Sequence, residues 1–380
     1  MVAASPFPFP QGSQVLIGQL ASALQRRGHR VTLVTYHCGV GHPPPGLDIL
    51  RILPRPRMGP VEARPSWQKP LLDLFLAQAL LRLVRRWQPD VIHTHNFEGL
   101  LAALLVRRLT AVPVVHHVHN AMGLELHTYF RYRATRWAGG LVGRWVDAHL
   151  PRRSEHCIVL NKRAEDYFRQ RGVERITVIP PGIEFAPREA GPAPQARGEG
   201  PLVFYSGNLD RYQDIDLLLR AFRLVANARP DARLVLGANS GPGNWQAQVD
   251  ALDLGGQVAF LLVDEFRTVR DWLAVADVAV CPRRTCLGFP IKLLNYMAAG
   301  KAIVASAGSA YGLRHMENGW VVADGDVPAM ASAILALLDD PVLARRLGES
   351  AQSTARGEYT WARAVTAVET IYEQLTGGKT

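Results

Sequence analysis

The hydrophobic positions of the chain alternate between short apolar runs, typical of buried strands, and longer amphipathic stretches, typical of helices. In the first half the apolar runs fall at 2–4, 31–35, 90–93, 113–117, 157–160 and 176–179. Helical spacing occurs at 14–27, 69–86 and 99–109, and the first of these stretches should bury Val15, Ile17, Leu20, Ala21 and Leu24. Strands alternating with helices predict one doubly wound parallel sheet up to about residue 180.

A stretch rich in Pro, Gly and Ala at 187–201 precedes a second series of the same kind. Its strands are predicted at 202–205, 233–237, 258–261, 277–281 and 302–305, and its helices at 215–228, 244–252, 269–276, from about 290 onward, 341–353 and 360–375. We therefore predict an α/β protein with an N-terminal domain at 1–185, a linker at 186–200, a C-terminal domain at 201–358 and a last helix at 359–380 that packs back toward the N-terminal domain. The carboxyl ends of both sets of strands are expected to line a cleft.

Composition indicates a folded protein, and charge separates the two halves. Of 380 residues, 48% are hydrophobic and 20% charged, with a formal net charge of +10. Counted from the sequence, residues 1–180 hold 24 Lys and Arg against 11 Asp and Glu, whereas 181–380 hold 19 against 22. An anionic partner on the first half, either a membrane surface or an acidic substrate, is expected.

Cysteine usage and the N-terminal residues favour a reducing, cytoplasmic location. The four cysteines form no CxxC pair and no cluster with histidine at metal-ligand spacing, so no metal site is expected. Residues 1–5 have neither a basic nor an apolar signal-peptide region, and the longest apolar run, 71–81, is too short to span a bilayer.

The stretch from Cys281 to Gly300, CPRRTCLGFPIKLLNYMAAG, is the most informative one. It passes from the end of a strand through an Arg-rich loop into a helix that should start near Pro290. Cations are disfavoured at a helix start unless an anion lies between them and the helix. Arg283, Arg284 and Lys292 therefore predict a phosphate-binding site. The alternative is that these side chains simply point into solvent.

Seven collinear motifs carry a resemblance to a known family. They are the run from Pro8 to Gln14, the Gly-His-Arg-Val run from Gly28, the Asp90–His95 run, His-Val-His-Asn from His117, Ile-Pro-Pro-Gly-Ile from Ile179, Gly-Asn-Leu from Gly207 and the run from Gly288 to Gly300. Together they resemble the GT-B retaining glycosyltransferases of glycosyltransferase family 4. The resemblance implies two Rossmann-like domains, the N-terminal one binding an acceptor and the C-terminal one a nucleotide-sugar donor. It also implies transfer with retention, without a metal or other cofactor.

The resemblance assigns roles to individual residues. It implies that His119 touches the donor sugar or the scissile region, that Gly12, Asn208 and Gln213 lie at the donor phosphates, and that Ser13 and Glu125 contact the acceptor. With the cations above and Arg211, the predicted phosphate-binding set is Gly12, Asn208, Arg211, Gln213, Arg283, Arg284 and Lys292. Leu287, Gly288 and Asn295 are expected at the nucleoside or sugar, and base selection near 261–266. Each of these residues also has an ordinary structural interpretation, such as a turn glycine or a packed histidine.

This chain departs from the family pattern at informative positions. Leu287 and Asn295 stand where the family usually has two Glu, and Asn208 and Gln213 where it usually has Arg and Lys. One interpretation is a degenerate, non-catalytic GT-B subunit; the other, which we favour, is that the phosphate-binding charge has moved to Arg211, Arg283, Arg284 and Lys292. No GxGxxG motif follows a strand, which argues against a dinucleotide-dependent oxidoreductase. A nucleotide-sugar epimerase or a phosphorylase of the same fold is not excluded.

The segment from Arg131 to Arg153 has six arginines, a single acid (Asp147) and two tryptophans, Trp137 and Trp145. Cations interleaved with tryptophan at helical spacing suit an anionic membrane surface. The alternative is a solvated helix face. We therefore expect contact with an anionic membrane surface through Arg131–Arg153 and an acceptor that is either a membrane-lipid-linked molecule or a glycan. No base-reading motif points to nucleic acid.

Overall fold

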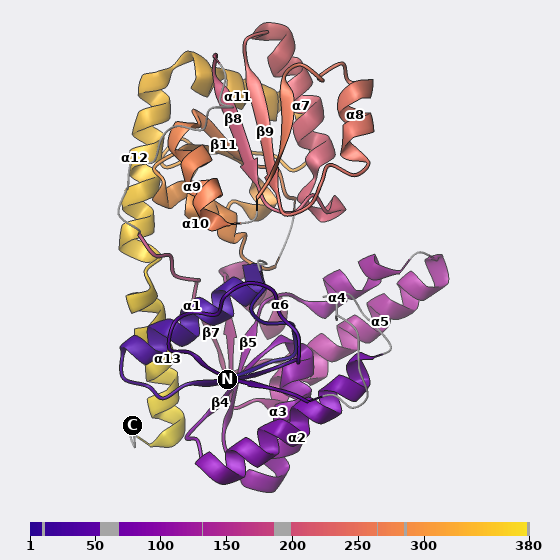
Figure 1. Ribbon diagram of the computed structural model, residues 1–380, viewed down its shortest axis with the longest axis vertical. Helices are drawn as coiled ribbons and strands as arrows, with labels where there is room; N and C mark the ends of the chain where they lie inside the picture. Colours follow the sequence, from indigo (N-terminus) through magenta and orange to yellow (C-terminus); the bar gives the residue numbers. More distant parts are fainter. Residues whose placement is uncertain are drawn as a thin grey trace. The chain divides into compact units, whose positions relative to one another are not determined.

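A computed structural model describes residues 1–9, 12–53, 68–130, 132–185, 199–263, 265–284 and 287–377. The chain forms two compact units (Figure 1). Unit 1 comprises Met1–Gly182, Leu287–Phe289 and Trp361–Thr380, and unit 2 comprises Ile183–Cys286 and Pro290–Thr360. Of the predicted linker at 186–200, residues 186–198 lie outside the described ranges.

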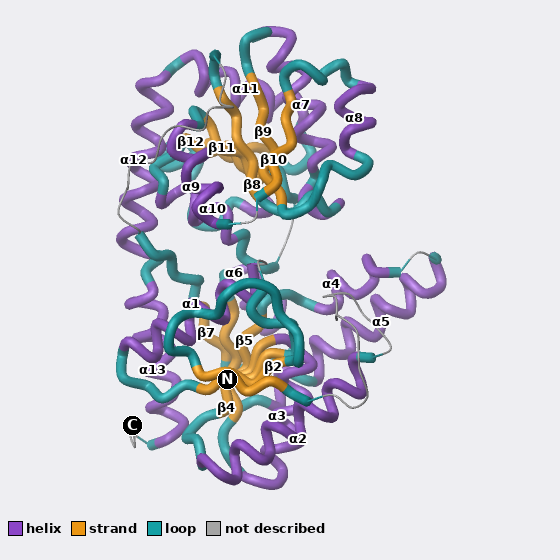
Figure 2. The backbone as a smooth tube through the Cα atoms, viewed as in Figure 1, coloured by secondary structure: helices purple, strands orange, loops and turns teal. Residues whose placement is uncertain are grey.

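Unit 1 is built on a parallel sheet in the order β3-β2-β1-β4-β5-β6-β7. Its strands are β1 (Val2–Ala3), β2 (Thr32–Thr35), β3 (Asp48–Arg51), β4 (Ile92–His95), β5 (Val114–Val118), β6 (His156–Val159) and β7 (Ile176–Val178). Figure 2 shows the strands inside and the helices around them. Strands buried on both faces are nearly continuous in apolar residues, which is why the sequence marks them as short hydrophobic runs.

The helices of unit 1 bury one face each. They are α1 (Gly12–Arg26), α2 (Lys69–Trp87), α3 (Asn96–Thr110), α4 (Met122–Glu125), α5 (Arg133–His149), α6 (Lys162–Arg169) and α13 (Trp361–Thr376), with short 3-10 turns at Leu126–Tyr129 and Pro151–Arg153. In α2 the buried positions recur every four residues, at Leu72, Leu76, Leu80 and Val84. Helix α1 buries Leu16, Ile17, Leu20 and Leu24, whereas Val15 is exposed, contrary to the predicted inner face.

Unit 2 repeats the architecture with a six-stranded parallel sheet in the order β10-β9-β8-β11-β12-β13. Its strands are β8 (Leu202–Ser206), β9 (Arg233–Ala238), β10 (Val258–Leu262), β11 (Val278–Cys281), β12 (Ala302–Ser306) and β13 (Trp320–Val322). Its helices are α7 (Ile215–Ala228), α8 (Trp245–Ala251), α9 (Phe266–Val275), α10 (Ile291–Ala298), α11 (Val327–Asp339) and α12 (Pro341–Glu358), with 3-10 turns at Arg211–Gln213 and Ala307–Ser309. Strand β8 has β9 on one side and β11 on the other, so the order in which strands are added to the sheet changes sides at β8. Parallel sheets of this kind bind ligands at such a switch point.

The predicted doubly wound sheets are confirmed, with differences in detail. Strands β3 and β13 and helices α6 and α11 had not been predicted, and α10 begins at Ile291 with Pro290 as its N-cap. Of the two last helices, α12 belongs to unit 2 and α13 to unit 1. Within the described ranges no single helix is long and apolar enough to cross a bilayer; α11 and α12 pass such a test only when joined across a 104° bend.

Candidate active site

In unit 2 the carboxyl ends of β8 and β11 bring together most of the predicted phosphate-binding residues. Residues 207–214 follow β8, and Arg283 and Arg284 follow β11. The carboxyl ends of parallel strands meet at one edge of the sheet. Helix α10 begins shortly after the β11 loop, and its N-cap residue, Pro290, makes no side-chain cap hydrogen bond. The sequence therefore delivers polar residues from three segments to one place.

Lys292 is the centre of a hydrogen-bond network at this edge. Its Nζ donates to Tyr205 Oη at 2.7 Å and to Gln213 Oε1 at 2.9 Å. Gln213 Nε2 donates in turn to Asn208 Oδ1 at 2.9 Å, and Asn208 Nδ2 donates to Tyr212 Oη at 2.6 Å. The side chains at 208 and 213, which lack the usual family charges, thus hold the cation that α10 supplies.

The ring of Tyr212 continues this network to a second cation. The guanidinium of Arg283 lies 4.7 Å from the centre of the Tyr212 ring, a cation–π contact. Burial raises the pKa of Tyr212 above its ordinary value, so this phenol stays neutral. Arg283 and Lys292 are therefore joined through Tyr212, Asn208 and Gln213 and are positioned as a pair.

Arg284 is placed differently from its neighbour. Its guanidinium pairs with Asp214, and the hydrogen bond to that carboxylate is the main reason that the pKa of Arg284 is raised. Asp214 neutralises much of the charge that Arg284 was predicted to offer a phosphate. Arg211 is exposed in the 3-10 turn after β8, and Asn295 is half-buried in α10.

In unit 1 the predicted residue His119 lies directly after β5 and contacts a buried face of histidines on β4 and β5. In the sheet register, His95 is the partner of His117, so His93, His95, His117 and His119 share one face. His119 Nε2 and His95 Nδ1 share a hydrogen bond of 2.9 Å, and His119 is buried. Burial lowers the pKa of His119 to about 4, so its imidazole is neutral at physiological pH.

Leu287 and Gly288 also belong to unit 1. Leu287 is buried in an apolar cluster with Val118 and Phe168, and its carbonyl accepts a hydrogen bond from Asn161 Nδ2 at 2.7 Å. A Cβ on Gly288 would lie 2.8 Å from the carbonyl oxygen of His119 and would also collide with Asn120 Oδ1. Packing accounts for both residues, and their contacts with a nucleoside or sugar stay predictions.

The predicted acceptor and base-selecting residues are dispersed. Gly12 begins α1 and is exposed, and Ser13 Oγ donates to Gln14 Oε1 at 2.7 Å. Glu125, at the end of α4, accepts a hydrogen bond from Tyr129 Oη at 2.6 Å. Of residues 261–266, position 264 lies outside the described ranges, while Leu262 and Phe266 are exposed.

Helix α5 carries the predicted membrane segment, of which Arg131 lies outside the described residues. Asp147, the only acid between 131 and 153, is buried, where its carboxylate accepts hydrogen bonds from the backbone of Met122 at 2.9 Å and Gly123 at 2.7 Å. Trp137 and Trp145 are more than half exposed. The outward face of α5 is consequently aromatic and basic, with no acidic side chain.

Several residues of the site had not been predicted. Tyr205, Tyr212 and Asp214 hold the cations of unit 2, and His95 holds His119. Tyrosines at strand ends are common in ordinary cores, so their type gave no signal. The period of two in the histidines of neighbouring strands was a signal, since it places them on one face.

Comparison with known proteins identifies the architecture first. The structure of Anabaena Alr3699/HepE in complex with UDP and glucose superposes with a TM-score of 0.76 at 15% identity, over 98% of this chain and 99% of that one. The two Rossmann-like units therefore form a GT-B fold.

The sequence comparisons then give the family. The Glycosyltransferase Family 4 model matches residues 10–186, and the Glycosyl transferases group 1 model matches residues 200–340. The chain is 28% identical to a D-inositol 3-phosphate glycosyltransferase of Xylanimonas cellulosilytica, over 96% of this chain and 92% of that protein. It is 26% identical to the phosphatidyl-myo-inositol mannosyltransferase of Mycolicibacterium smegmatis, over 99% and 94%. The chain is a family 4-like glycosyltransferase.

Proposed function

We propose that this protein transfers a hexosyl group from a nucleotide-sugar donor to an acceptor with retention at the anomeric carbon and without a metal ion in the transfer step. The observation that carries the proposal is the Arg283–Tyr212–Asn208–Gln213–Lys292 network at the carboxyl edge of the unit 2 sheet. Two cations held by neutral side chains at a strand-to-helix junction suit a diphosphate. The relative crystallised with UDP and glucose supports this donor class.

Negative charge develops on the diphosphate as the glycosidic bond breaks. Lys292 and Arg283, fixed before the reaction, would stabilise that charge without rearranging, and the positive end of the α10 dipole would add to it. In unit 1, His119 is neutral and can offer a hydrogen bond to the donor or acceptor without adding charge. No carboxylate replaces the two usual Glu at Leu287 and Asn295, so the leaving group itself would take part in deprotonating the acceptor.

The test is a turnover assay with a panel of UDP- and GDP-hexoses and inositol phosphates or phosphatidylinositol as acceptors, with product configuration read by NMR and with a chelator present. We expect Lys292→Met to lower kcat/KM by about 10²- to 10³-fold, the usual cost of removing one oxyanion-stabilising group. Arg220→Ala removes an exposed cation that pairs with Asp216 on α7 and serves as the matched control.

One observation supports the alternative of a non-catalytic donor-binding subunit: Leu287, which stands where the family usually has Glu, is buried in an apolar cluster. Donor binding by calorimetry with no product for any pair would establish that alternative. Full activity of the Lys292→Met variant would rule out the proposal that Lys292 binds the donor diphosphate.

We also propose that an anionic membrane surface contacts the outer face of α5, which would present a lipid-linked acceptor. Trp137, Leu141 and Trp145 recur every four residues and are exposed beside Arg133 and Arg144. Tryptophan and arginine together suit the lipid headgroup region. The lipid acceptor named for the mycobacterial relative supports this proposal.

Sedimentation with vesicles tests the membrane contact. We expect binding to phosphatidylglycerol-containing vesicles but not to pure phosphatidylcholine, and a loss of at least about tenfold in the Trp137→Ser/Trp145→Ser variant. Leu74→Ser, which changes an exposed apolar residue on α2, is the matched control. Equal binding to both kinds of vesicle, or unchanged binding of the double variant, would contradict the proposal.

A further inference from the structure

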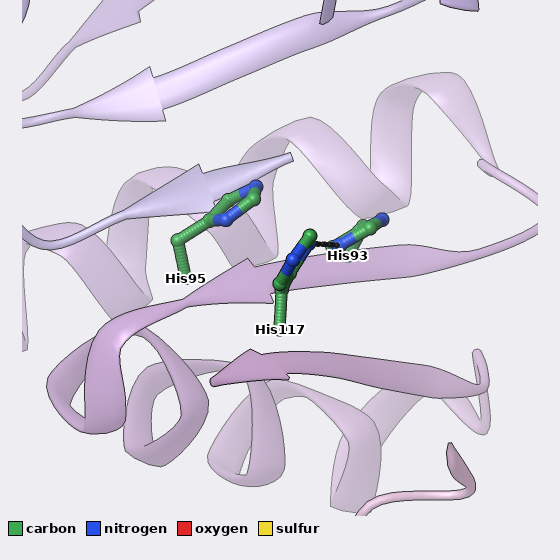
Figure 3. A group of neighbouring side chains, drawn as sticks. All are labelled: His93, His95 and His117. Carbon is green, nitrogen blue, oxygen red and sulfur yellow. Dashed lines mark hydrogen bonds between the residues drawn. The ribbon is translucent and has the colours of Figure 1, made fainter. Parts of the chain in front are cut away.

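The buried histidine face of unit 1 has polar atoms that its own hydrogen bonds do not use. His93, His95 and His117 lie on neighbouring strands with ring centres 4.9 to 5.4 Å apart (Figure 3). At most 3% of each residue is exposed. One ligand nitrogen from each ring can be chosen so that all three lie within 4.8 Å of one another. Three imidazoles are thus gathered in a place that solvent does not reach.

The hydrogen bonds leave one nitrogen on two of these rings without a partner. His93 Nε2 and His117 Nδ1 share a bond of 3.3 Å, and His95 Nδ1 shares one of 2.9 Å with His119 Nε2. Among the residues described, nothing hydrogen-bonds to His95 Nε2 or His117 Nε2. A buried polar atom without a partner costs free energy, so both nitrogens are candidates to bind an additional ligand.

The bonds already present can fix the tautomer that a metal requires. If His95 Nδ1 donates to His119 and His117 Nδ1 donates to His93, then both Nε2 atoms carry lone pairs. The opposite assignment leaves two buried N–H groups with no acceptor. Histidine that binds a metal through one nitrogen and donates from the other is the usual arrangement at such sites.

We propose that His93, His95 and His117 bind a divalent transition-metal ion of the zinc class inside unit 1. His95 and His117 would bind through Nε2. His93 would bind through Nε2, while its Nδ1 keeps Tyr372 Oη of α13 at 2.5 Å. The long bond between His93 Nε2 and His117 Nδ1 would then break, and the loss of an acceptor for that N–H is a cost that the metal bonds must offset. Three neutral imidazoles suit zinc, copper or nickel rather than magnesium or calcium, and a water or small anion would fill the fourth position.

The site requires a small contraction. Tetrahedral zinc with Zn–N bonds of about 2.0–2.1 Å brings its ligand nitrogens to roughly 3.3 Å from one another. One nitrogen from each ring lies within 4.8 Å of the others, and rotation of the rings about their side-chain bonds would bring the three Nε2 atoms to the shorter distance. The ion would join β4 to β5 and hold His95 in the tautomer that donates to His119. The ion would be held by unit 1 residues alone, and the proposal gives it no part in the transfer step.

The experiment titrates Zn²⁺ into the full-length, chelator-treated protein against a chromophoric competitor. We expect one equivalent to bind. His95→Gln and His117→Gln should each weaken binding by more than the roughly 10- to 100-fold that loss of an outer partner costs. His116→Gln should leave it unchanged, because His116 is equally buried on the same strand but bonds to Thr94 on the opposite face.

If the variants with buried substitutions do not fold, X-ray absorption at the zinc edge of the wild-type complex tests whether three histidines bind the ion. Three imidazole nitrogens at about 2.0–2.1 Å are expected in the first shell. Failure to bind one equivalent, binding that both Gln variants retain, or a first shell with sulfur or fewer than three imidazoles would overturn the proposal.

Discussion

Gly207, immediately after β8, gives Lys292 the room that it needs. The residue has φ of +141°, a region that side-chain-bearing residues rarely adopt, and a Cβ there would lie 2.5 Å from Lys292 Nζ. Gly207→Ala should therefore displace the ammonium from Tyr205 and Gln213. Because a misplacement of about 1 Å can cost 10²-fold in rate, we expect kcat/KM to fall by about 10- to 100-fold in a folded protein.

Steady-state kinetics with the best donor measures this effect, and circular dichroism checks folding. Gly255→Ala is the matched control, because a Cβ at Gly255 meets no atom within 4 Å. Wild-type kinetics of Gly207→Ala would show that the position of Lys292 does not matter for turnover.

Glu98, in the first turn of α3, is expected to make the stability of unit 1 fall as the pH rises. Burial raises its pKa from 4.5 to about 6, an effect that Lys69 at 3.6 Å opposes only in part. The folded state thus binds the proton more tightly than the unfolded state, so this carboxyl's contribution to stability is full below pH 4.5 and is lost as the pH rises through 6. The total loss is about 2 kcal/mol.

Glu98→Gln cannot ionise, so its free energy of unfolding relative to wild type should increase by about 2 kcal/mol between pH 4 and pH 7. Urea unfolding followed at several pH values measures this difference. A difference that stays constant over the range would show that Glu98 titrates normally in the folded protein.

Asp147 joins α5 to α4. Its two carboxylate oxygens accept from the backbone of Met122 and Gly123, and Tyr167 Oη donates to it at 2.8 Å. Asp147→Ala leaves these donors unpaired, and we expect unfolding free energy to fall by about 2–4 kcal/mol. Asp147→Asn keeps one acceptor oxygen and should cost less. Equal stability of the Ala variant and wild type in urea would contradict this role.

The sequence predicted the strands that are short apolar runs and the helices with a clear apolar face, but not elements without that contrast. Helix α11 is apolar on nearly all sides, so it shows little periodicity, although Asp326 caps it and Pro lies in its first turn. Strand β3 begins and ends with charged residues, and β13 has only three residues. For these three segments the sequence does not distinguish a helix or strand from a loop.

The candidate site was predictable where it depended on charge and position, and not where it depended on partners. Arg283 and Lys292 were predicted from a strand-to-helix junction, which the parallel sheet then brings to one edge. The pairing of Arg284 with Asp214 joins residues 70 positions apart, and no local pattern encodes it. The sequence therefore shows where the cations lie along the chain, but not which of them pairs with a distant carboxylate.

The chain returns to unit 1 twice, briefly at Leu287–Phe289 and finally, after unit 2 is complete, through α13. Glu369 on this helix accepts from Arg27 at 2.9 Å and from His29 at 3.0 Å. Trp361 lies so close to Gly182 that a Cβ there would be 2.6 Å from the indole ring. Helix α13 also buries Val365, Val368 and Ile371. Unit 1 is thus a discontinuous unit that the first 182 residues alone do not complete.

Deleting residues 361–380 should therefore destabilise unit 1 selectively. A buried apolar side chain contributes about 1.5–3 kcal/mol, so losing one Trp, two Val and one Ile removes roughly 6–12 kcal/mol, which is comparable with the whole stability of a typical domain. Scanning calorimetry should show two transitions for the full chain and only that of unit 2 for the truncated one. A chain that ends at Gly377 keeps all of α13 and is the control. Loss of both transitions would mean that unit 2 cannot fold without unit 1, and retention of both would mean that α13 is dispensable to the unit it completes.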